Sequence, residues 1–409
     1  MSLAIEYAEK ADARLANGRL DLVRMRRDRH AKLLAQLADR HLDAILLITS
    51  GNVLYASGMR LPAVDGGRAV HQRTAVLVVA GERYPHIFTS WPELAPGELP
   101  PDHVHPPLWP DNEAGVADLV RRVGDLVPAD AVVGVDDSTF AMHVGLPRLA
   151  PGWQLKSATP LLVAARLHKT EDEVECMWRA WLINEAANAA AEELVRPGVR
   201  LTELVGTYYR RLYELGATCN FLDPVFQVMP SRIADGPWST NGDVPFALIT
   251  TDQVVGAGDV IWTDTVMGYE GYSSDVGRTW FVDRPTATQR SLYEQWSDIT
   301  QAVLDAMKPG VSGAELCALA TELNGGRKPW LDHYFLGHTL GLEGGEQQRF
   351  GSDLGPEADE KLILEPGMAV VIEPITWADG ECGYRCEELV IITDDGAERV
   401  SSYPDTPFL

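Results

Sequence analysis

The sequence predicts a two-domain chain, with an α/β domain followed by an α+β domain built from two related halves. Three observations predict this fold class. The 409 residues exceed the length of one typical domain. Short apolar strands alternate with helical stretches in the first part of the chain. An internal repeat runs through the second part. We place the boundary at the start of a long helix, which gives domains at residues 1–165 and 166–409.

The first domain is predicted from the periodicity of its apolar residues. Short apolar runs indicate buried strands, and longer amphipathic stretches indicate helices. A Gly-Glu pair at residues 81–82 predicts a turn between two strands. In chain order, the expected segments are 22–40 (helix), 43–48 (strand), 73–88 (two strands), 113–126 (helix), 131–137 (strand) and 139–149 (helix).

A long helix at residues 165–195 opens the second domain. Thr170 is a candidate N-cap, and Glu173 follows three residues later at the capping-box spacing. The rest of the domain carries three pairs of related segments in the same order, which indicates a duplicated half-domain. The pairs are RPGVRLTEL (196–204) with KPGVSGAEL (308–316), GDVIWTD (258–264) with GMAVVIE (367–373), and GYSSD (271–275) with GYRCE (383–387).

The charge balance is strongly acidic, with 35 Lys and Arg against 59 Asp and Glu and a net charge of −24. Such a chain repels phosphate backbones and anionic lipids, so we expect neither nucleic-acid nor membrane partners. We find no signal-peptide pattern and no apolar run long enough to span a membrane. The five cysteines are odd in number and scattered, which favours a reducing cytoplasm.

Each half of the repeat places two acids around an antiparallel hairpin. An apolar strand ends on Asp264 or Glu373, and the returning strand brings Asp275 or Glu387. Four buried carboxylates cannot all remain ionised without compensation, and two divalent cations would cancel their charge. The alternative is that these acids lie on solvated strand ends. His338, between glycines and apolar residues, is either a fifth ligand or a core histidine.

One imidazole and four carboxylates form a hard, oxygen-rich set that suits two divalent metal ions, with Mn first and Fe, Co or Zn as options. Two adjacent ions with an open bridging position generate a hydroxide nucleophile near neutral pH. Cys382 and Cys386 could suggest a separate metal pair. They lack a second pair or a nearby histidine, so buried core thiols are the better interpretation.

The motifs around these residues resemble those of the pita-bread metallopeptidases, which include methionine aminopeptidase, prolidase, aminopeptidase P and creatinase. The resemblance rests on GYSSDVGRT, LGHTLGL, EPGMAVVIEP and YRCEELVIIT. The N-x-x-Y-x-x-G element from Asn52 to Gly58 resembles the N-terminal domain of the creatinase and prolidase branch. The resemblance therefore implies a creatinase-like N-terminal domain followed by a pita-bread catalytic domain.

The resemblance also implies roles for the five residues. Asp264 would bind one metal ion, His338 and Glu373 the other, and Asp275 and Glu387 would bridge both. Glu373 would also handle the proton of the attacking water. The implied activity is that of a metallohydrolase of the Xaa-Pro peptidase type, acting on a small-molecule or short-peptide substrate. Members of the two-domain branch are commonly homodimers, so a homodimer is expected.

Two departures from the family pattern concern substrate contacts. The peptidases carry a histidine where this chain has Phe246 in VPFAL, and another where it has Gly345. Those imidazoles contact the substrate and stabilise the tetrahedral intermediate, which neither phenylalanine nor glycine can do. Four nearby residues are candidate replacements for the lost groups: His333, Tyr334, Glu343 and Glu346.

These departures keep other functions open. One is a metal-dependent lyase resembling dimethylsulfoniopropionate lyase, although that branch has an aspartate where this chain has Gly344. A creatinase-like amidinohydrolase works without metals, and a non-catalytic binding module would usually lose ligands. Both fit poorly with a complete ligand set. Trp262, Tyr272 and Trp280 are either core residues or an aromatic wall beside the substrate.

Overall fold

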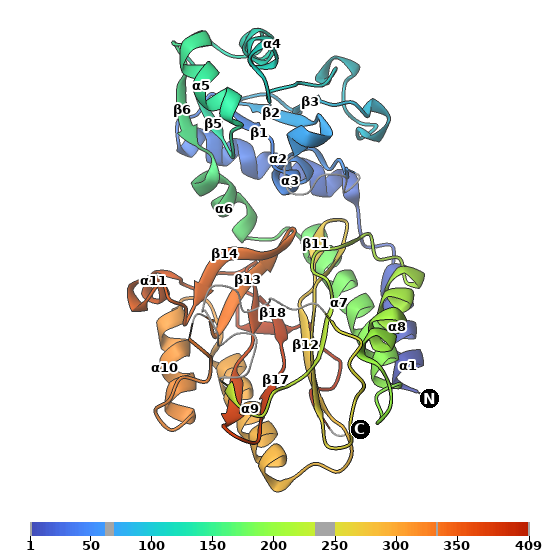
Figure 1. Cartoon of the computed structure of the whole chain (residues 1–409). Coiled ribbons are helices and arrows are strands. Elements are labelled where there is room, and N and C mark those ends of the chain that lie inside the picture. The colour runs from blue at the N-terminus through green and yellow to red at the C-terminus, as the bar shows by residue number, and fades with distance from the viewer. Residues whose placement is uncertain (1, 62–68, 234–249, 333, 408–409) are drawn as a thin grey trace. The chain divides into compact units, whose positions relative to one another are not determined.

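The computed structural model describes residues 2–61, 69–233, 250–332 and 334–407. The chain forms two compact units (Figure 1). The first unit is Leu20–Asp172, and the second combines Met1–Arg19 with Glu173–Leu409. Helix α1 (Leu3–Leu15) thus belongs to the second unit, where Tyr7 and Ala11 join a buried core with α7 and α8.

The first unit is built on one six-stranded sheet in the order β4-β3-β2-β1-β5-β6. All four residues of the central strand β1 are buried, as its continuous apolar run predicts. It pairs antiparallel with β2 and parallel with β5. The strands are β1 (Ala44–Leu47), β2 (Ala75–Val79), β3 (His86–Phe88), β4 (Val104–His105), β5 (Val132–Val135) and β6 (Gln154–Ser157).

Helices cover both faces of this sheet (Figure 1). Valines and leucines of α4 and α5 pack on one face in a single buried cluster with β1, β2 and β5. On the other face lie α2, whose N-cap Asp21 accepts hydrogen bonds from Val23 and Arg24, and helices α3 and α6. The bounds are α2 (Leu22–Asp39), α3 (Ser50–Ser57), α4 (Glu113–Gly124), α5 (Phe140–Leu149) and α6 (Thr159–Leu167).

The predicted segments of the first unit are confirmed to within a few residues, but the long helix at 165–195 is wrong at its start. Residues up to Leu167 belong to α6, and α7 begins at Glu171, directly after the predicted cap residue Thr170. The backbone leaves the helical conformation at His168, where ψ is 114°. No glycine or proline marks this break in the sequence.

The second unit contains two halves with a similar order of elements, to which the second half adds helix α11. The first half comprises α7 (Glu171–Glu192), α8 (Leu201–Glu214), β7 (Cys219–Asn220), β8 (Val225–Val228), β9 (Val260–Thr265), β10 (Met267–Tyr269), β11 (Tyr272–Ser273) and β12 (Val276–Phe281). The second half comprises α9 (Ala287–Ala306), α10 (Gly313–Leu323), β13 (Gly337–Gly341), β14 (Gly344–Phe350), α11 (Pro356–Lys361), β15 (Ala369–Ile372), β16 (Ile375–Ala378), β17 (Cys382–Arg385) and β18 (Glu388–Ile392), and β19 (Ala397–Arg399) follows it.

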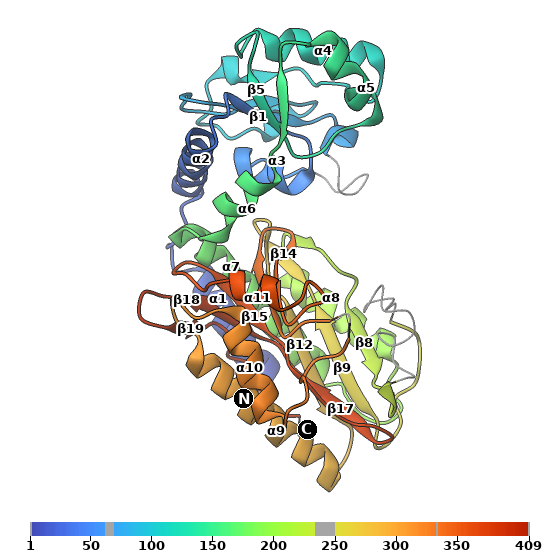
Figure 2. The ribbon, with the colours of Figure 1, turned by 90° about the vertical axis from the view of Figure 1, so that its left-hand side faces the viewer.

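The strand pairings of the two halves correspond. In the first half β9 pairs with β12, and β10 with β11. In the second half β15 pairs with β18, and β16 with β17. Figure 2 shows β8, β9 and β12 side by side, with β17 next to β12 and helices α9 and α10 side by side. The repeat seen in the sequence therefore corresponds to one long hairpin in each half. At the tip of each long hairpin lies a second, short pair of strands, β10–β11 or β16–β17.

One apolar cluster supports the first half, and a second contains residues of both halves, among them Trp262 and Trp296. Tyr208 of α8, Ile261 of β9 and Trp280 of β12 belong to one buried cluster with α7. Trp296 of α9 packs edge-on against Tyr384 of β17, with ring centroids 5.3 Å apart. Within the described ranges, no helix is long and apolar enough to cross a membrane.

Candidate metal centre

The four predicted acids lie at equivalent places on the two hairpins. Asp264 lies on β9, and Asp275 comes directly before β12. Glu373 comes directly after β15, and Glu387 directly before β18. All four are buried, with exposed fractions of 2%, 9%, 1% and 1% in that order. Asp264, Asp275 and Glu387 each place a carboxylate oxygen within 4.8 Å of the others. The solvated-strand-end alternative does not describe these side chains.

His338 joins the acids from β13, which pairs with β15. Its Nε2 lies 3.3 Å from Oδ2 of Asp275 and 3.4 Å from Oε1 of Glu373. Its Nδ1 lies 2.9 Å from the carbonyl of Thr339, which can only accept, so Nδ1 carries a proton. In neutral His338 the Nε2 lone pair would then face two carboxylates. A cation among these groups removes that repulsion.

Arg385, at the end of β17, is the residue that the sequence analysis missed. Its Nη2 lies 2.6 Å from Oε2 of Glu373 and 3.2 Å from Oδ2 of Asp264, and it also pairs with Glu387. The guanidinium is 3% exposed and is shared by acids from both halves. The signal was present in GYRCE: an arginine inside a buried strand requires a partner, and the neighbouring acids supply it.

One guanidinium does not balance four buried carboxylates. Burial raises the pKa of Asp264 to about 7, although Arg385 opposes this shift. Burial likewise raises the pKa of Glu387, and the nearby carboxylates raise it further. Oε2 of Glu387 is buried without a hydrogen-bond partner among the described residues. For His338, burial alone would lower the pKa, but Asp275 and Glu373 raise it overall.

The shortage of positive charge around the four buried carboxylates fits a metal-ion centre. The acids provide carboxylate oxygens, His338 provides an imidazole nitrogen, and Oε2 of Glu387 lacks a partner that a cation would supply. Oxygen donors with one nitrogen suit Mn, Fe, Co or Zn. The five residues from the two halves can therefore hold divalent metal ions.

The other predicted catalytic residues lie in different surroundings. Tyr334 is buried, and its hydroxyl accepts a 2.7 Å hydrogen bond from Arg385. Burial raises its pKa well above the ordinary value, so the phenol keeps its proton. Glu346 on β14 lies against Gly341 of β13. Gly345 pairs with Leu340 in the same ladder. His333 and Phe246 lie outside the described residues.

The aromatic residues predicted near the site are core residues. Trp262, Tyr272 and Trp280 are each 1% exposed. Trp262 lies beneath Arg385, with the guanidinium carbon 5.8 Å from its ring. The hydroxyl of Tyr272 donates to Glu173, and Trp280 packs in the cluster with α7 and α8. Cys382 and Cys386 are buried thiols, and Cys386 contacts the Tyr384 hydroxyl at 3.1 Å.

A second buried arginine supports Glu387 from behind. Nη1 of Arg278 donates to the carbonyls of Glu387 (2.7 Å) and Gly277 (2.8 Å), and Nη2 donates to that of Tyr403 (3.1 Å). Glu388 lies 3.7 Å from Arg278 and also pairs with Arg399 at 2.9 Å. Gly277 packs so closely on Glu387 that a Cβ there would lie 3.0 Å from its Cγ and Cδ.

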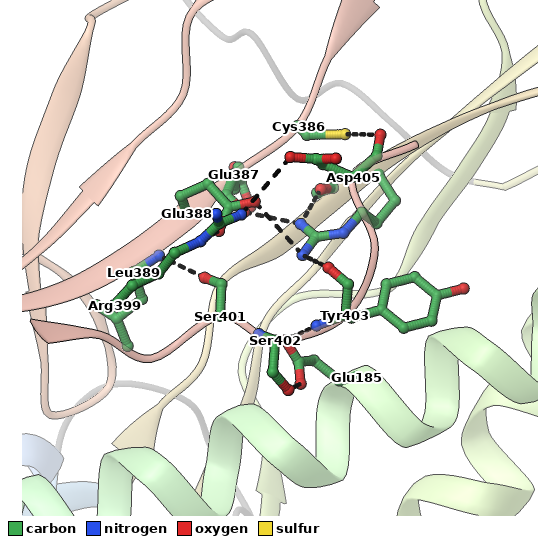
Figure 3. Close-up of polar contacts among 12 residues, drawn as sticks. Glu185, Cys386, Glu387, Glu388, Leu389, Arg399, Ser401, Ser402, Tyr403 and Asp405 are labelled. Carbon is green, nitrogen blue, oxygen red and sulfur yellow. Dashed lines mark hydrogen bonds and ion pairs between the residues drawn. The ribbon is translucent and has the colours of Figure 1, made fainter. Parts of the chain in front are cut away.

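The C-terminal segment completes this support (Figure 3). Glu185 points from α7 toward the segment and accepts hydrogen bonds from the backbone N–H groups of Ser402 (2.7 Å) and Tyr403 (2.8 Å). Burial raises the pKa of Glu185 to about 7, and Arg278 and these hydrogen bonds limit the shift. Arg278 thus links the backbone of Glu387 to a segment anchored on α7.

The fold and the donor set together define a two-domain metallohydrolase. The model of metallopeptidase family M24 matches residues 175–394, and the model of the creatinase/prolidase N-terminal domain matches residues 29–168. The chain therefore belongs to metallopeptidase family M24. These matches confirm the fold class and the kind of enzyme that the sequence motifs predict.

Named relatives are similar over much of the chain. It is 30% identical to a Xaa-Pro dipeptidase of Pyrococcus furiosus over 251 residues, which are 61% of this chain and 67% of that protein. It is 27% identical to a probable dipeptidase PepE of Mycobacterium tuberculosis (strain H37Rv) over 310 residues, 71% of this chain and 77% of that protein.

Solved structures share the two-domain fold. The prolidase of Pyrococcus horikoshii OT3 superposes with a TM-score of 0.72 at 22% identity, covering 92% of this chain and 98% of that one. A recombinant prolidase of Thermococcus sibiricus gives a TM-score of 0.76 at 20% identity, covering 96% and 100%. At these identities the similarity concerns the fold alone.

Proposed function

We propose that this protein is a divalent-metal-dependent dipeptidase that cleaves the C–N bond of small Xaa-Pro-like substrates. The observation that carries the proposal is the convergence of five buried donor residues from both halves, of which Asp264, Glu373 and Glu387 pair with Arg385. The relatives named Xaa-Pro dipeptidase and dipeptidase support the substrate class.

Two metal ions are proposed, with Mn²⁺ as the first choice. Asp264 would hold one ion, His338 and Glu373 the other, and Asp275 and Glu387 would serve both. Bound ions would lower the pKa of the attacking water and polarise the scissile carbonyl. The close packing of Gly277 on Glu387 and the hydrogen bond from Arg278 to the Glu387 carbonyl keep that carboxylate in place.

Glu373 is the proposed proton carrier. Its Oε2 is held by Arg385 and its Oε1 lies near His338, so the buried carboxylate has a fixed orientation. In the reaction it would accept a proton from the attacking water and deliver it to the leaving nitrogen. A carboxylate can do both in one catalytic cycle without changing its net charge.

Tyr334 is the proposed electrophilic residue in place of the histidines lost at Phe246 and Gly345. Its hydroxyl keeps its proton because burial raises its pKa, and Arg385 fixes its oxygen. A neutral phenol near the acids can donate to an oxygen that becomes negative during the reaction. His333 and Glu346 remain proposed secondary contacts. We also propose a cytoplasmic homodimer, and the five free cysteines are compatible with a reducing compartment.

The test is turnover of a panel of Xaa-Pro dipeptides by Mn²⁺-loaded protein, with Xaa-Ala dipeptides as the specificity comparison. Asp275→Asn should abolish turnover and lower bound metal, because it removes a negative charge that the two proposed cations would share. The matched control is Asp298→Asn, the same change at an exposed position of α9, which should retain full activity.

Two outcomes would contradict the proposal. Absence of dipeptide turnover in protein that holds two metal ions per chain would exclude the peptidase activity. Equal turnover by the wild type and Asp275→Asn would exclude the proposed site. In the first case, proton abstraction from small carboxylates is the next assay, which tests lyase chemistry directly.

A further inference from the structure

The first unit contains a second cluster of metal-ligating side chains. Four of the ten histidines of the chain lie near the turn between β2 and β3: His30, His86, His103 and His105. His86 opens β3, and His103 ends the short helix η3 (Pro101–His103). His105 lies on β4, which pairs in parallel with β3. Glu82 in the turn supplies a carboxylate.

These groups contact one another directly. Nε2 of His86 lies 2.7 Å from Oε2 of Glu82, and Nδ1 of His86 lies 3.0 Å from Nε2 of His105. The rings of His86 and His103 are stacked with centroids 4.2 Å apart. One ligand atom from each of Glu82, His86 and His103 falls within 4.8 Å of the other two.

We propose that Glu82, His86 and His103 form a second metal site, which binds one borderline divalent cation of the Zn²⁺ type. Two imidazoles and one carboxylate are a donor set typical of Zn²⁺, with a water as the fourth ligand. The site contrasts with the carboxylate-rich centre of the second unit, where oxygen donors dominate. It is independent of the proposed dipeptidase function.

The hydrogen bonds of His86 suit a ligating histidine. Binding through Nε2 replaces the contact with Glu82 by two bonds to the ion, and the proton of His86 then lies on Nδ1. From there it donates to Nε2 of His105, whose own proton is on Nδ1. The number of protons is unchanged. A metal-bound histidine commonly donates its second N–H in this way, which fixes the ring.

The surroundings keep His86 and His105 neutral and leave the site open to solvent. Burial lowers the pKa of His86 and lowers that of His105 to about 4, so both are neutral at pH 7. The side chain of His86 is 6% exposed and that of Glu82 is 36% exposed, which leaves an approach from solvent. The backbone carbonyl of Glu82 lies 2.9 Å from Nε2 of His30, which anchors the turn.

Coordination requires one local movement. The stacked rings of His86 and His103 have an interplanar angle of 3°, so their lone pairs run parallel instead of converging. His103 must turn out of the stack to direct a nitrogen at the ion. It is half-buried, and its contact with the carbonyl of Pro85 is a 3.3 Å hydrogen bond that such a turn can release. His103 is therefore the ligand that closes the site.

The test is equilibrium dialysis of the full chain against buffered Zn²⁺, with bound zinc per chain measured by mass spectrometry of the metal. His86→Gln and His103→Gln should each lose about one zinc ion relative to the wild type. His105→Gln should keep the ligands but bind about 10–100-fold more weakly, because the ring of His86 loses its partner. The matched control is His143→Gln, at an exposed position of α5, which should bind as the wild type does.

Zinc bound in the second unit cancels in the difference between variants. Circular dichroism and thermal unfolding in chelator verify that each variant is folded. If His86→Gln does not fold, because His86 is more buried than His103, the zinc content of His103→Gln alone tests the site. Equal zinc content in the wild type, His86→Gln and His103→Gln would overturn the proposal. So would an equal loss in His143→Gln, which would indicate nonspecific histidine binding.

Discussion

The two halves of the second unit share strand pairings and ligand positions, but they place their buried arginines differently. Arg278 follows Asp275 by three residues and donates to backbone carbonyls behind Glu387. Arg385 precedes Glu387 by two residues and contacts the carboxylates themselves. At the repeat offset of 112 residues, the counterpart of Arg385 is Ser273, and that of Arg278 is Val390.

This difference assigns two roles to the two halves: one half neutralises the acids, and the other holds the backbone in place. Both copies supply acids to the centre. Among the described residues, only the second copy supplies a positive charge to these acids, and only the first supplies an arginine that donates hydrogen bonds to the backbone of the opposite hairpin. A metal ion can substitute for the charge of Arg385, but it cannot substitute for hydrogen bonds to carbonyls. The two arginines should therefore respond differently to metal.

The largest effect is expected for Arg385→Ser, which replaces Arg385 by the residue type found at its counterpart in the first half, Ser273. In metal-free protein three acids lose their shared cation, and breaking a buried ion pair typically costs about 3–5 kcal/mol. Saturating Mn²⁺ should restore most of this stability, whereas activity should fall about 10²–10³-fold. Urea unfolding in chelator and in Mn²⁺ measures the first effect, and dipeptide turnover the second.

The control for Arg385→Ser is Arg284→Ser, at an exposed position after β12, which should leave stability and turnover unchanged. If Arg385→Ser were equally destabilised with and without Mn²⁺, Arg385 would be a structural residue like Arg278, and the contrast between the halves would disappear.

Arg278→Met should destabilise the protein by about 3 kcal/mol, at the lower end of the range for a buried ion pair. The loss is smaller because three of its partners are neutral carbonyls and Glu388 keeps its contact with Arg399. The decrease in the free energy of unfolding should be the same in chelator and in Mn²⁺. If Mn²⁺ restored the stability of Arg278→Met, Arg278 would instead act by neutralising the acids of the centre, as Arg385 does.

Much of this arrangement is predictable from the sequence because local patterns determine it. Apolar strands that end on acids, repeated at one offset, predicted the hairpins and the convergence of Asp264, Asp275, Glu373 and Glu387. The position of His338 between glycines predicted its place beside them.

Other features depend on contacts between distant segments. The sequence does not identify Arg385 as part of the centre, because it does not show that acids from both halves pair with it. Helix α1 packs with α7 and α8 across more than 150 residues of chain, through Tyr7 and Ala11. The break between α6 and α7 carries no glycine or proline, so periodicity alone joins the two helices.

Glu185 provides a test by pH of the segment that Arg278 reaches. Burial raises its pKa from 4.5 to about 7, so the folded chain holds a proton that the unfolded chain has lost. Its contribution to stability should therefore fall as the pH rises from about 4.5 to 7, by about 3 kcal/mol in total, and level off above. Denaturant unfolding across this range should show the fall in the wild type.

Glu185→Gln mimics the protonated acid and should remove this pH dependence. Because Arg278 lowers the pKa of Glu185, Arg278→Met should raise the folded-state pKa further and extend the fall in stability to higher pH. Identical pH profiles for the wild type and Glu185→Gln would show that Glu185 is ionised throughout, held so by its four hydrogen bonds.

The smallest effect is expected for Ser273→Ala, at the counterpart of Arg385. The hydroxyl of Ser273 is buried without a hydrogen-bond partner among the described residues, so its removal should change the free energy of unfolding by less than about 0.5 kcal/mol. The neighbouring Ser274 is the matched comparison, because its hydroxyl accepts from Asn184 (2.9 Å) and donates to the carbonyl of Met267 (3.2 Å). Ser274→Ala should cost about 1–3 kcal/mol. If thermal unfolding showed the two alanine variants to be equally stable, Ser273 would contribute as much to stability as the hydrogen-bonded Ser274, and the expected difference between the two positions would be wrong.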